Sequence, residues 1–325
     1  MLKEFEVSST EAAFFAEWPW LPNVGPGANA SALPNLKTLT LHHTPFKWSS
    51  PILRNLHVLN LRALPITHLP LDRILFILSN NPELKSVSLH FQGVLAPVLP
   101  LSTVTLPHVT TFSLGGHPLL SQLLESLILP NLDSLTLDIE ARDPIEDIVS
   151  GLLTRSNRPP IQHLSLAYGL MPNVANFYYG PGGIVITWNT LLAELPLLKS
   201  LHIGGTSVEP LLSALGPPED DPNNTGPSTL NNSNNANTPA WVCPNLESIA
   251  MKSCHAHGEG VQRLVQMVEA RNPQGGQLAL SLNGITPVRL TRLELHDCAA
   301  LGEDIMNWLD QRIADVVCVD PSYER

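Results

Sequence analysis

The sequence predicts an α/β solenoid, with parallel strands on its concave face and helices on its convex face. Two stretches, LPNLKTLTLHHT at 33–44 and LPNLDSLTLDIE at 129–140, are nearly the same. The pattern L-x-x-L-x-L that they share recurs along the chain, and helical patterns lie between its copies. Self-similarity of this kind is the signature of a repeat architecture. We therefore expect one domain over residues 1–325, built from about ten stacked repeats.

Nine copies of the pattern have an aliphatic or aromatic residue at all three positions. They are Leu36/Leu39/Leu41, Leu56/Leu59/Leu61, Leu84/Val87/Leu89, Val109/Phe112/Leu114, Leu132/Leu135/Leu137, Ile161/Leu164/Leu166, Leu198/Leu201/Ile203, Leu246/Ile249/Met251 and Leu290/Leu293/Leu295. Leu2, Phe5 and Val7 form a tenth copy. The last two positions of each copy have a period of two, which predicts a short strand with its apolar side chains facing inward.

The segments between the strands have helical periodicity. Helices are expected at 71–81, 119–129, 143–156, 188–195, 260–272 and 301–316. At the start of the third segment, Asp143 is a candidate cap and Pro144 suits the first helical position. One strand buries about three apolar side chains at roughly 1.5–3 kcal/mol each, too little to order a repeat alone, so neighbouring repeats must stack.

The repeats resemble leucine-rich repeats, and the chain resembles the repeat region of F-box-like proteins of basidiomycete fungi. The words that carry this resemblance are LPNLKTLTLHHT, NPELKSVSLHF, CPNLESIAMKSCH and the ending LTRLELHDCAALGEDIMNWLDQRIADVVCVDP. The resemblance implies a non-catalytic protein–protein interaction scaffold, the substrate-recognition region of an F-box-type ubiquitin ligase subunit. The family places a helical F-box before its repeats, whereas here the first repeat starts at residue 2.

The F-box is therefore expected to be absent from this sequence. Contact with an F-box adaptor and a cullin then requires an F-box upstream of Met1. The alternative is a leucine-rich-repeat binding domain without a ubiquitin-ligase link, as a truncated or degenerate copy. If repeats are missing at the front, residues 1–20 form an apolar end, partly covered by Phe14, Phe15, Trp18 and Trp20, through which the protein self-associates.

Composition narrows the possible partners and the compartment. The chain has 18 Lys and Arg against 29 Asp and Glu, a formal charge of −11, and it has no basic cluster. An acidic chain of this kind is a poor ligand for nucleic acid or an anionic membrane. Residues 1–18 lack the apolar core of a signal peptide. We expect a cytoplasmic or nuclear protein with its four cysteines in the thiol form.

No motif for catalysis, a cofactor or a phosphate group occurs in the sequence. The run Cys254-His255-Ala256-His257 suggests zinc, but Cys254 lies three residues after Met251, where leucine-rich repeats place Asn or Cys. Cys298 follows Leu295 in the same way. Such residues turn inward and bond backbone groups at the end of the strand. We therefore expect no metal site, no cofactor and no enzyme.

The outward strand positions are the candidate binding surface for a protein partner. Its candidate residues are His42, Arg62, His90, Asp138, His163, His202, Lys252, Arg292, Glu294 and His296. The remaining outward positions are mostly Ser and Thr, and the alternative is that these hydroxyl residues are simply suited to exposed strands. The C-terminal end, with its mixed charges, is the most distinctive part of the surface.

The sequence of two further segments predicts an insertion and a terminal cap. Residues 217–240 are rich in Asn, Pro and Gly and almost devoid of apolar side chains, which predicts a disordered insertion. The helix at 301–316 places Leu301, Ile305, Trp308, Leu309 and Ile313 on one stripe. Together with residues 316–319, it is expected to cap the last repeat.

Overall fold

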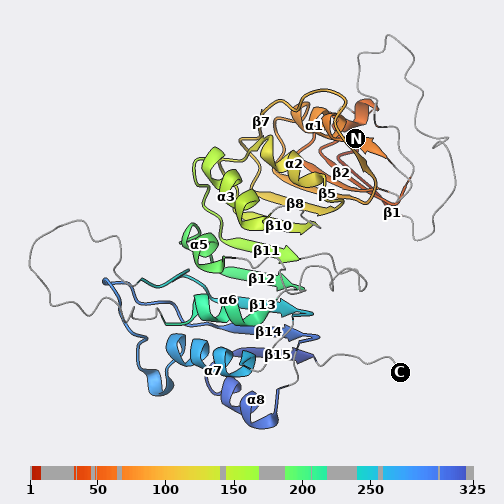
Figure 1. The fold of residues 1–325 in the computed structure, drawn as a ribbon. Coiled ribbons are helices and arrows are strands. Elements are labelled where there is room, and N and C mark those ends of the chain that lie inside the picture. The colour runs from red at the N-terminus through yellow and green to blue at the C-terminus, as the bar shows by residue number, and fades with distance from the viewer. Residues whose placement is uncertain are drawn as a thin grey trace, which may run out of the picture. The chain divides into compact units, whose positions relative to one another are not determined.

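A computed structural model describes residues 2–8, 33, 35–44, 48, 50–63, 68–139, 144–167, 187–205, 207–217, 240–254, 259–298 and 301–319. Its main feature is an 11-stranded, all-parallel sheet in which each strand neighbours the next strand of the repeat series (Figure 1). The order is β1 (Glu4–Ser8), β2 (Thr38–His42), β3 (Val58–Arg62), β5 (Ser86–Phe91), β8 (Thr111–Gly116), β10 (Ser134–Ile139), β11 (His163–Ala167), β12 (Ser200–Gly204), β13 (Ser248–Lys252), β14 (Arg292–His296) and β15 (Asp315–Val319). The predicted α/β repeat solenoid is confirmed.

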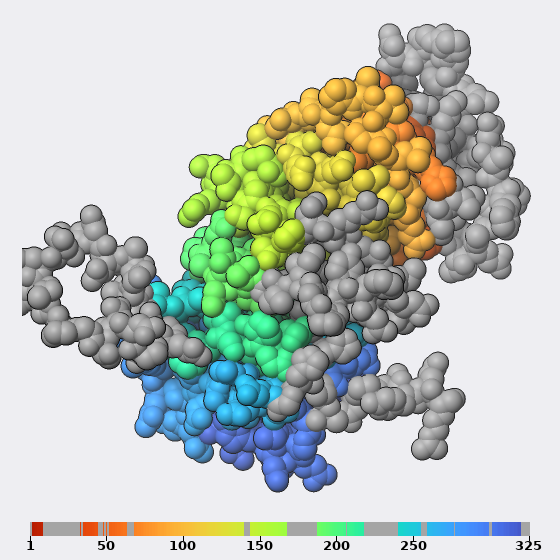
Figure 2. All heavy atoms as spheres, viewed as in Figure 1, coloured from red at the N-terminus to blue at the C-terminus, as the bar shows by residue number. Residues whose placement is uncertain are grey.

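The chain divides into two compact units. The N-terminal unit comprises Met1–Ile161 and Ser165–Val174, and the C-terminal unit comprises Gln162–Leu164 and Ala175–Arg325. In Figure 2 the colours of each unit follow one another from repeat to repeat, as expected when each repeat packs on its sequence neighbours.

The register of the sheet follows the repeat pattern. Leu39 pairs with Leu59 and Leu41 with Leu61, and Ile249 pairs with Leu293. The inward residues of the sheet strands from β2 to β14 are almost fully buried. The residues between them are half-buried or exposed, apart from the buried glycines Gly115 and Gly204. All ten predicted strands are confirmed. An eleventh, β15, was predicted as part of the terminal cap, but it pairs in parallel with β14.

The helices lie at α1 (Leu71–Ser79), α2 (Leu120–Glu125), α3 (Ile145–Arg155), α5 (Trp188–Ala193), α6 (Val208–Leu215), α7 (Gly260–Arg271) and α8 (Glu303–Asp310). Short 3₁₀ turns occur at Pro51–Leu53 and Gln274–Gly276. Two small parallel pairs, β4 (Leu69–Pro70) with β6 (Val94–Leu95) and β7 (Val104–Thr105) with β9 (Leu127–Ile128), accompany the N-terminal unit.

The six predicted helices are present, but their limits differ from the predictions. The helix predicted at 119–129 ends at Glu125, before β9. The last helix ends at Asp310 instead of 316, because the chain passes into β15. The helix predicted from 143 begins at Ile145, with Pro144 at the cap position. Helix α6 was not predicted. Its Pro210 suggests a break, yet it stands at the third helical residue, where a missing N–H breaks no helical hydrogen bond.

Buried polar side chains at helix ends join consecutive repeats. Asn81 follows α1, is fully buried, accepts a hydrogen bond from the backbone N–H of Leu56 and donates to the carbonyls of Leu53 and Ile77, all at 2.7–2.8 Å. Asn272 follows α7 and makes three such bonds, two of them with Leu290. These side chains satisfy backbone groups that the repeat geometry would otherwise bury unpaired.

Arg271, at the end of α7, is fully buried as well. Its guanidinium donates to the carbonyls of Leu215, Val242 and Cys243 at 2.6–3.2 Å and lies over the ring of Trp241. Burial lowers its pKa to about 10, so it remains charged at neutral pH. It holds the 240–243 segment against α6 and α7.

Several predictions concern residues that lie partly or wholly outside the described part of the chain. They concern the insertion at 217–240, the Asp143 cap, and the aromatic residues expected to cover residues 1–20. Within the described part, Leu2 is 47% exposed, and Phe5 and Val7 of β1 are half-buried. The single-domain organisation and the capping role of α8 stay predictions.

Candidate functional site

The strand face, defined as the outward positions of the 11-stranded sheet, carries all ten predicted binding residues. In the N-terminal unit, the parallel register places His42, Arg62, His90, Gly115 and Asp138 in one row across strands β2 to β10. The next rows toward the strand starts are mainly hydroxyl residues, such as Ser88, Ser113 and Thr136. Sequence reasoning found this face because strand alternation fixes which side chains point outward.

Gly115 shapes the middle of the N-terminal row. It is buried although it holds an outward position, because the ring of His90 from the neighbouring strand lies over it. A Cβ atom at residue 115 would overlap His90 Nδ1. Burial lowers the pKa of His90; Arg62 and His43 lower it further, and Asp138 acts in the opposite direction. The glycine was not among the predicted residues, since only the register shows that it faces His90.

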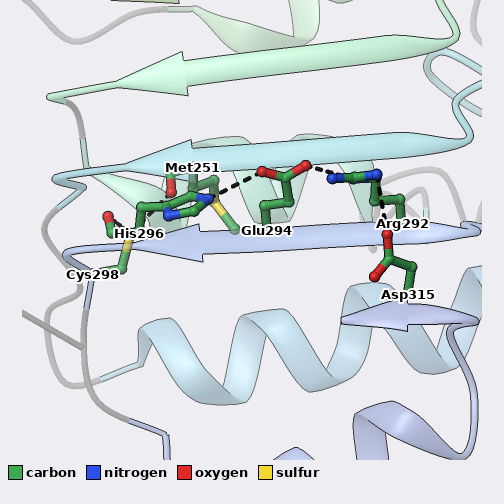
Figure 3. Close-up of polar contacts among 6 residues, drawn as sticks. All are labelled: Met251, Arg292, Glu294, His296, Cys298 and Asp315. Atoms are coloured by element: carbon green, nitrogen blue, oxygen red, sulfur yellow. Dashed lines mark hydrogen bonds and ion pairs between the residues drawn. The ribbon is translucent and has the colours of Figure 1, made fainter. Parts of the chain in front are cut away.

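The C-terminal unit holds the most connected cluster of the strand face. Glu294 of β14 lies between Arg292 and His296 on the same strand, and Asp315 of β15 lies beside Arg292 (Figure 3). The distances are 2.5 Å from Arg292 Nε to Glu294 Oε1, 3.0 Å from His296 Nε2 to Glu294 Oε2, and 3.1 Å from Arg292 Nη1 to Asp315 Oδ2. We call these four residues the β14–β15 cluster.

Strand geometry explains this arrangement. Residues 292, 294 and 296 alternate with Leu293 and Leu295, which are buried, so all three polar side chains emerge on one side of β14. Hydrogen bonds from His296 and Arg292 lower the pKa of Glu294, and the hydrogen bond to Glu294 raises the pKa of Arg292. The cluster thus joins an arginine, a histidine and two carboxylates in one connected set of contacts.

The register brings two more predicted residues near the cluster. Lys252 pairs with His296, and His202 stands in the same row as Glu294, with Ala250 between them. Desolvation lowers the pKa of His202, Glu294 opposes that change, and His296 and Lys252 add to it. His163, at the start of β11, is exposed.

Asp315 was not among the predicted binding residues, because it falls within the helix predicted at 301–316, whereas α8 ends at Asp310. The sequence contained a signal, since Val316, Val317 and Val319 are β-branched and favour a strand. An additional strand in register with β14 places an acidic residue next to Arg292.

Cys254 and Cys298 occupy the position that the sequence indicated, three residues after the last inward residue of the strand. Cys254 and Cys298 are buried, and each lies within hydrogen-bonding distance of a backbone carbonyl of the preceding strand. Thr44, in the same slot, is buried too, although its Oγ1 has no hydrogen-bond partner among the described residues. His255 and His257 lie outside the described residues. Elsewhere, in the part of the chain that the structure describes, no group of three or more His, Cys, Asp or Glu side chains is placed to hold a metal ion.

No helix within the described ranges is long and apolar enough to cross a membrane. No family model, curated protein or solved structure matches the chain.

Proposed function

We propose that this protein is a non-catalytic scaffold that binds a protein partner across its strand face. The observation that carries the proposal is the β14–β15 cluster, a set of charged side chains fixed in geometry on an otherwise hydroxyl-rich face. Charged groups of both signs in fixed positions favour a partner with the complementary arrangement and disfavour others. Solenoids offer such extended surfaces because each repeat adds one strand to the same face.

The composition of the face supports a polar, selective contact. Interface hot spots are enriched in Trp, Tyr and Arg, and two of the outward residues are arginines, Arg62 and Arg292. Arg292 is about half exposed and already oriented by two carboxylates. A partner carboxylate or backbone carbonyl could reach its remaining donor atoms without rearrangement of the strand.

The finer proposal is that the scaffold is the substrate-recognition region of an F-box-type ubiquitin ligase subunit. It rests on the resemblance of the repeats and of the ending at 290–321 to F-box-like proteins. The partner on the strand face would then be the ubiquitination substrate, and adaptor and cullin would be recruited by an F-box outside the repeats. The second candidate is a leucine-rich-repeat binding domain with no ligase link.

Affinity purification of the tagged full chain from its native cells separates the two candidates. Co-purification of an adaptor and a cullin with the protein tagged at its endogenous gene supports the ligase function. Recovery of a partner without either subunit supports the second candidate. Failure to retain any protein in stoichiometric amount would contradict the scaffold itself.

A further inference from the structure

Cys254 and Cys298 hold the same position in two adjacent repeats. Each lies three residues after the last inward residue of its strand, Met251 in β13 and Leu295 in β14, and these two residues pair in register. The turns that follow are the same, since Ser253 and Asp297 have left-handed φ values of 50° and 52°. The parallel register, continued through equivalent turns, therefore sets the two cysteines side by side.

The hydrogen bonds of the two thiols repeat in the same way. Cys254 Sγ lies 3.7 Å from the carbonyl of Ile203 and 3.4 Å from that of Lys252. Cys298 Sγ lies 3.5 Å from the carbonyl of Met251 and 3.3 Å from that of His296. Each sulfur thus contacts equivalent carbonyls one repeat apart. Neighbouring strands are in general about 4.7–4.9 Å apart, within the range of about 4.4–6.8 Å that a disulfide spans between Cα atoms. The side-chain hydrogen bond between the two cysteines brings their sulfur atoms near each other.

The two buried environments differ from that of a third cysteine. The Cys254 side chain hydrogen-bonds to the Cys298 sulfur, and this bond, aided by the Cys254 backbone, lowers the pKa of Cys298 to about 7 although burial opposes it. Burial instead raises the pKa of Cys243 to about 12. Since the thiolate is the reactive form, Cys298 has the chemistry of a nucleophile and Cys243 does not.

Cys298 is one of the residues that line a small cavity. Its volume is about 30 Å³, and its walls include Cys298 with Met251 and Leu295 from the strands, Leu212 from α6 and Leu264 from α7. One water needs about 10–15 Å³ of such space, so a molecule with two oxygen atoms fits there. All these walls belong to the C-terminal unit.

We propose that Cys254 and Cys298 form an inter-repeat disulfide when the protein meets a small peroxide such as hydrogen peroxide. The Cys298 thiolate attacks one peroxide oxygen, the O–O bond breaks, and the departing hydroxide takes up a proton to become water. The sulfur of Cys254, losing its proton, then attacks the Cys298 sulfenic acid. The S–S bond forms, the S–O bond breaks and a second water leaves. Two thiols are oxidised, and one peroxide is reduced to two waters. This inference does not depend on what the strand face binds.

The direct test is peptide mapping of the full chain. The native protein is treated with hydrogen peroxide, alkylated under denaturing conditions and digested with trypsin without reduction. Cleavage after Lys252, Arg263, Arg292 and Arg312 isolates one cysteine in each of the peptides 253–263 and 293–312. The expected product is these two peptides joined by a disulfide, while Cys243 is recovered alkylated.

Two variants keep the outcome interpretable. Cys243→Ser is the matched control, and the cross-link should form in it at the wild-type rate. Cys254→Ser removes the resolving thiol, so Cys298 should stop at the sulfenic acid and be trapped by dimedone. The proposal is overturned if Cys298 is recovered alkylated after peroxide treatment, or if it is oxidised to sulfinic acid in the wild type without the cross-link.

Discussion

Arg292 of β14 and Asp315 of β15 face each other in register, with Nη1 3.1 Å from Oδ2. Together with Glu294, which contacts both Arg292 and His296, they give the strand face of the C-terminal unit its ordered charges. Exposed ion pairs of this kind contribute little to folding. We therefore expect the cluster to contribute little to the free energy of unfolding, as the proposed role in recognition allows.

The carboxyl group of Glu294 should titrate below its ordinary pKa of 4.5, because His296 and Arg292 hydrogen-bond to its charged form. Carbon-detected NMR of the carboxyl group measures this value. In His296→Ala or Arg292→Ala the midpoint should rise toward 4.5. A lowered folded-state pKa stabilises the fold above 4.5, and this contribution is lost as pH falls through the folded-state value. An unchanged Glu294 midpoint in both variants would contradict the geometry of the cluster.

Gly115→Ala should displace the His90 ring while sparing the backbone. The new Cβ overlaps the end of a side chain that can rotate away, and the His90 pKa should then rise toward 6.5 because the ring regains water. An NMR titration of His90 measures this shift.

Gly116→Ala is the matched control for that substitution. Gly116 has a φ of +101°, and its Cβ would meet the carbonyl of Phe91. This variant should lose about 1–3 kcal/mol or more of unfolding free energy from backbone strain. Equal losses of stability in the two variants would contradict the placement of His90 over Gly115.

Folding stability should decline as the pH falls through 6.5. Desolvation lowers the pKa values of His90 and His202, so just below pH 6.5 the unfolded chain binds more protons than the folded chain. The free energy of unfolding therefore decreases there and levels off below the folded-state pKa values. Urea denaturation between pH 8 and pH 5.5 measures the slope. The double variant His90→Gln/His202→Gln should show a shallower slope, and an identical slope would refute the assignment.

Asn81→Ala should destabilise the N-terminal unit by about 1–3 kcal/mol or more, because it leaves the Leu56 amide and two carbonyls buried without their partner. Asn131→Ala is the matched control. Asn131 is exposed and makes one hydrogen bond, to the carbonyl of Pro107, so its loss should cost well under 1 kcal/mol. Equilibrium denaturation compares the two, and equal costs would show that Asn81 does not support the repeat junction.

The repeat strands could be predicted from the sequence because two simple constraints act together. The alternation of Leu39 and Leu41 with polar residues fixes which face is buried, and recurrence of the pattern fixes the register between strands. The same logic predicted which candidate binding residues lie on the strand face, and it predicted the inward slot of Cys254. Six of the seven described helices were predicted and α6 was not, whereas helix limits were less predictable, as the end of α8 illustrates.

The remaining features depend on contacts between repeats. Gly115 faces His90 only because β5 and β8 pair in a given register, and Asp315 reaches Arg292 only because the chain adds a strand after α8. Asn81 and Arg271 bond backbone groups 28 and 56 residues distant in sequence. Polar residues at helix ends have many possible roles, so their burial follows from packing and not from a local pattern.

The most direct test of the central claim compares one charge reversal on the strand face with one on a helix. Arg292→Glu disrupts the β14–β15 cluster, whereas Arg263→Glu alters an arginine of α7 that is ion-paired with Glu259 at 3.6 Å. Both variants change the charge by the same amount in the C-terminal unit. The measurement is quantitative capture of the native partner by each variant, after circular dichroism shows that both are folded. We predict that Arg292→Glu captures at least tenfold less partner than the wild type, and that Arg263→Glu captures as much as the wild type. Equal capture by both variants would contradict recognition through the strand face.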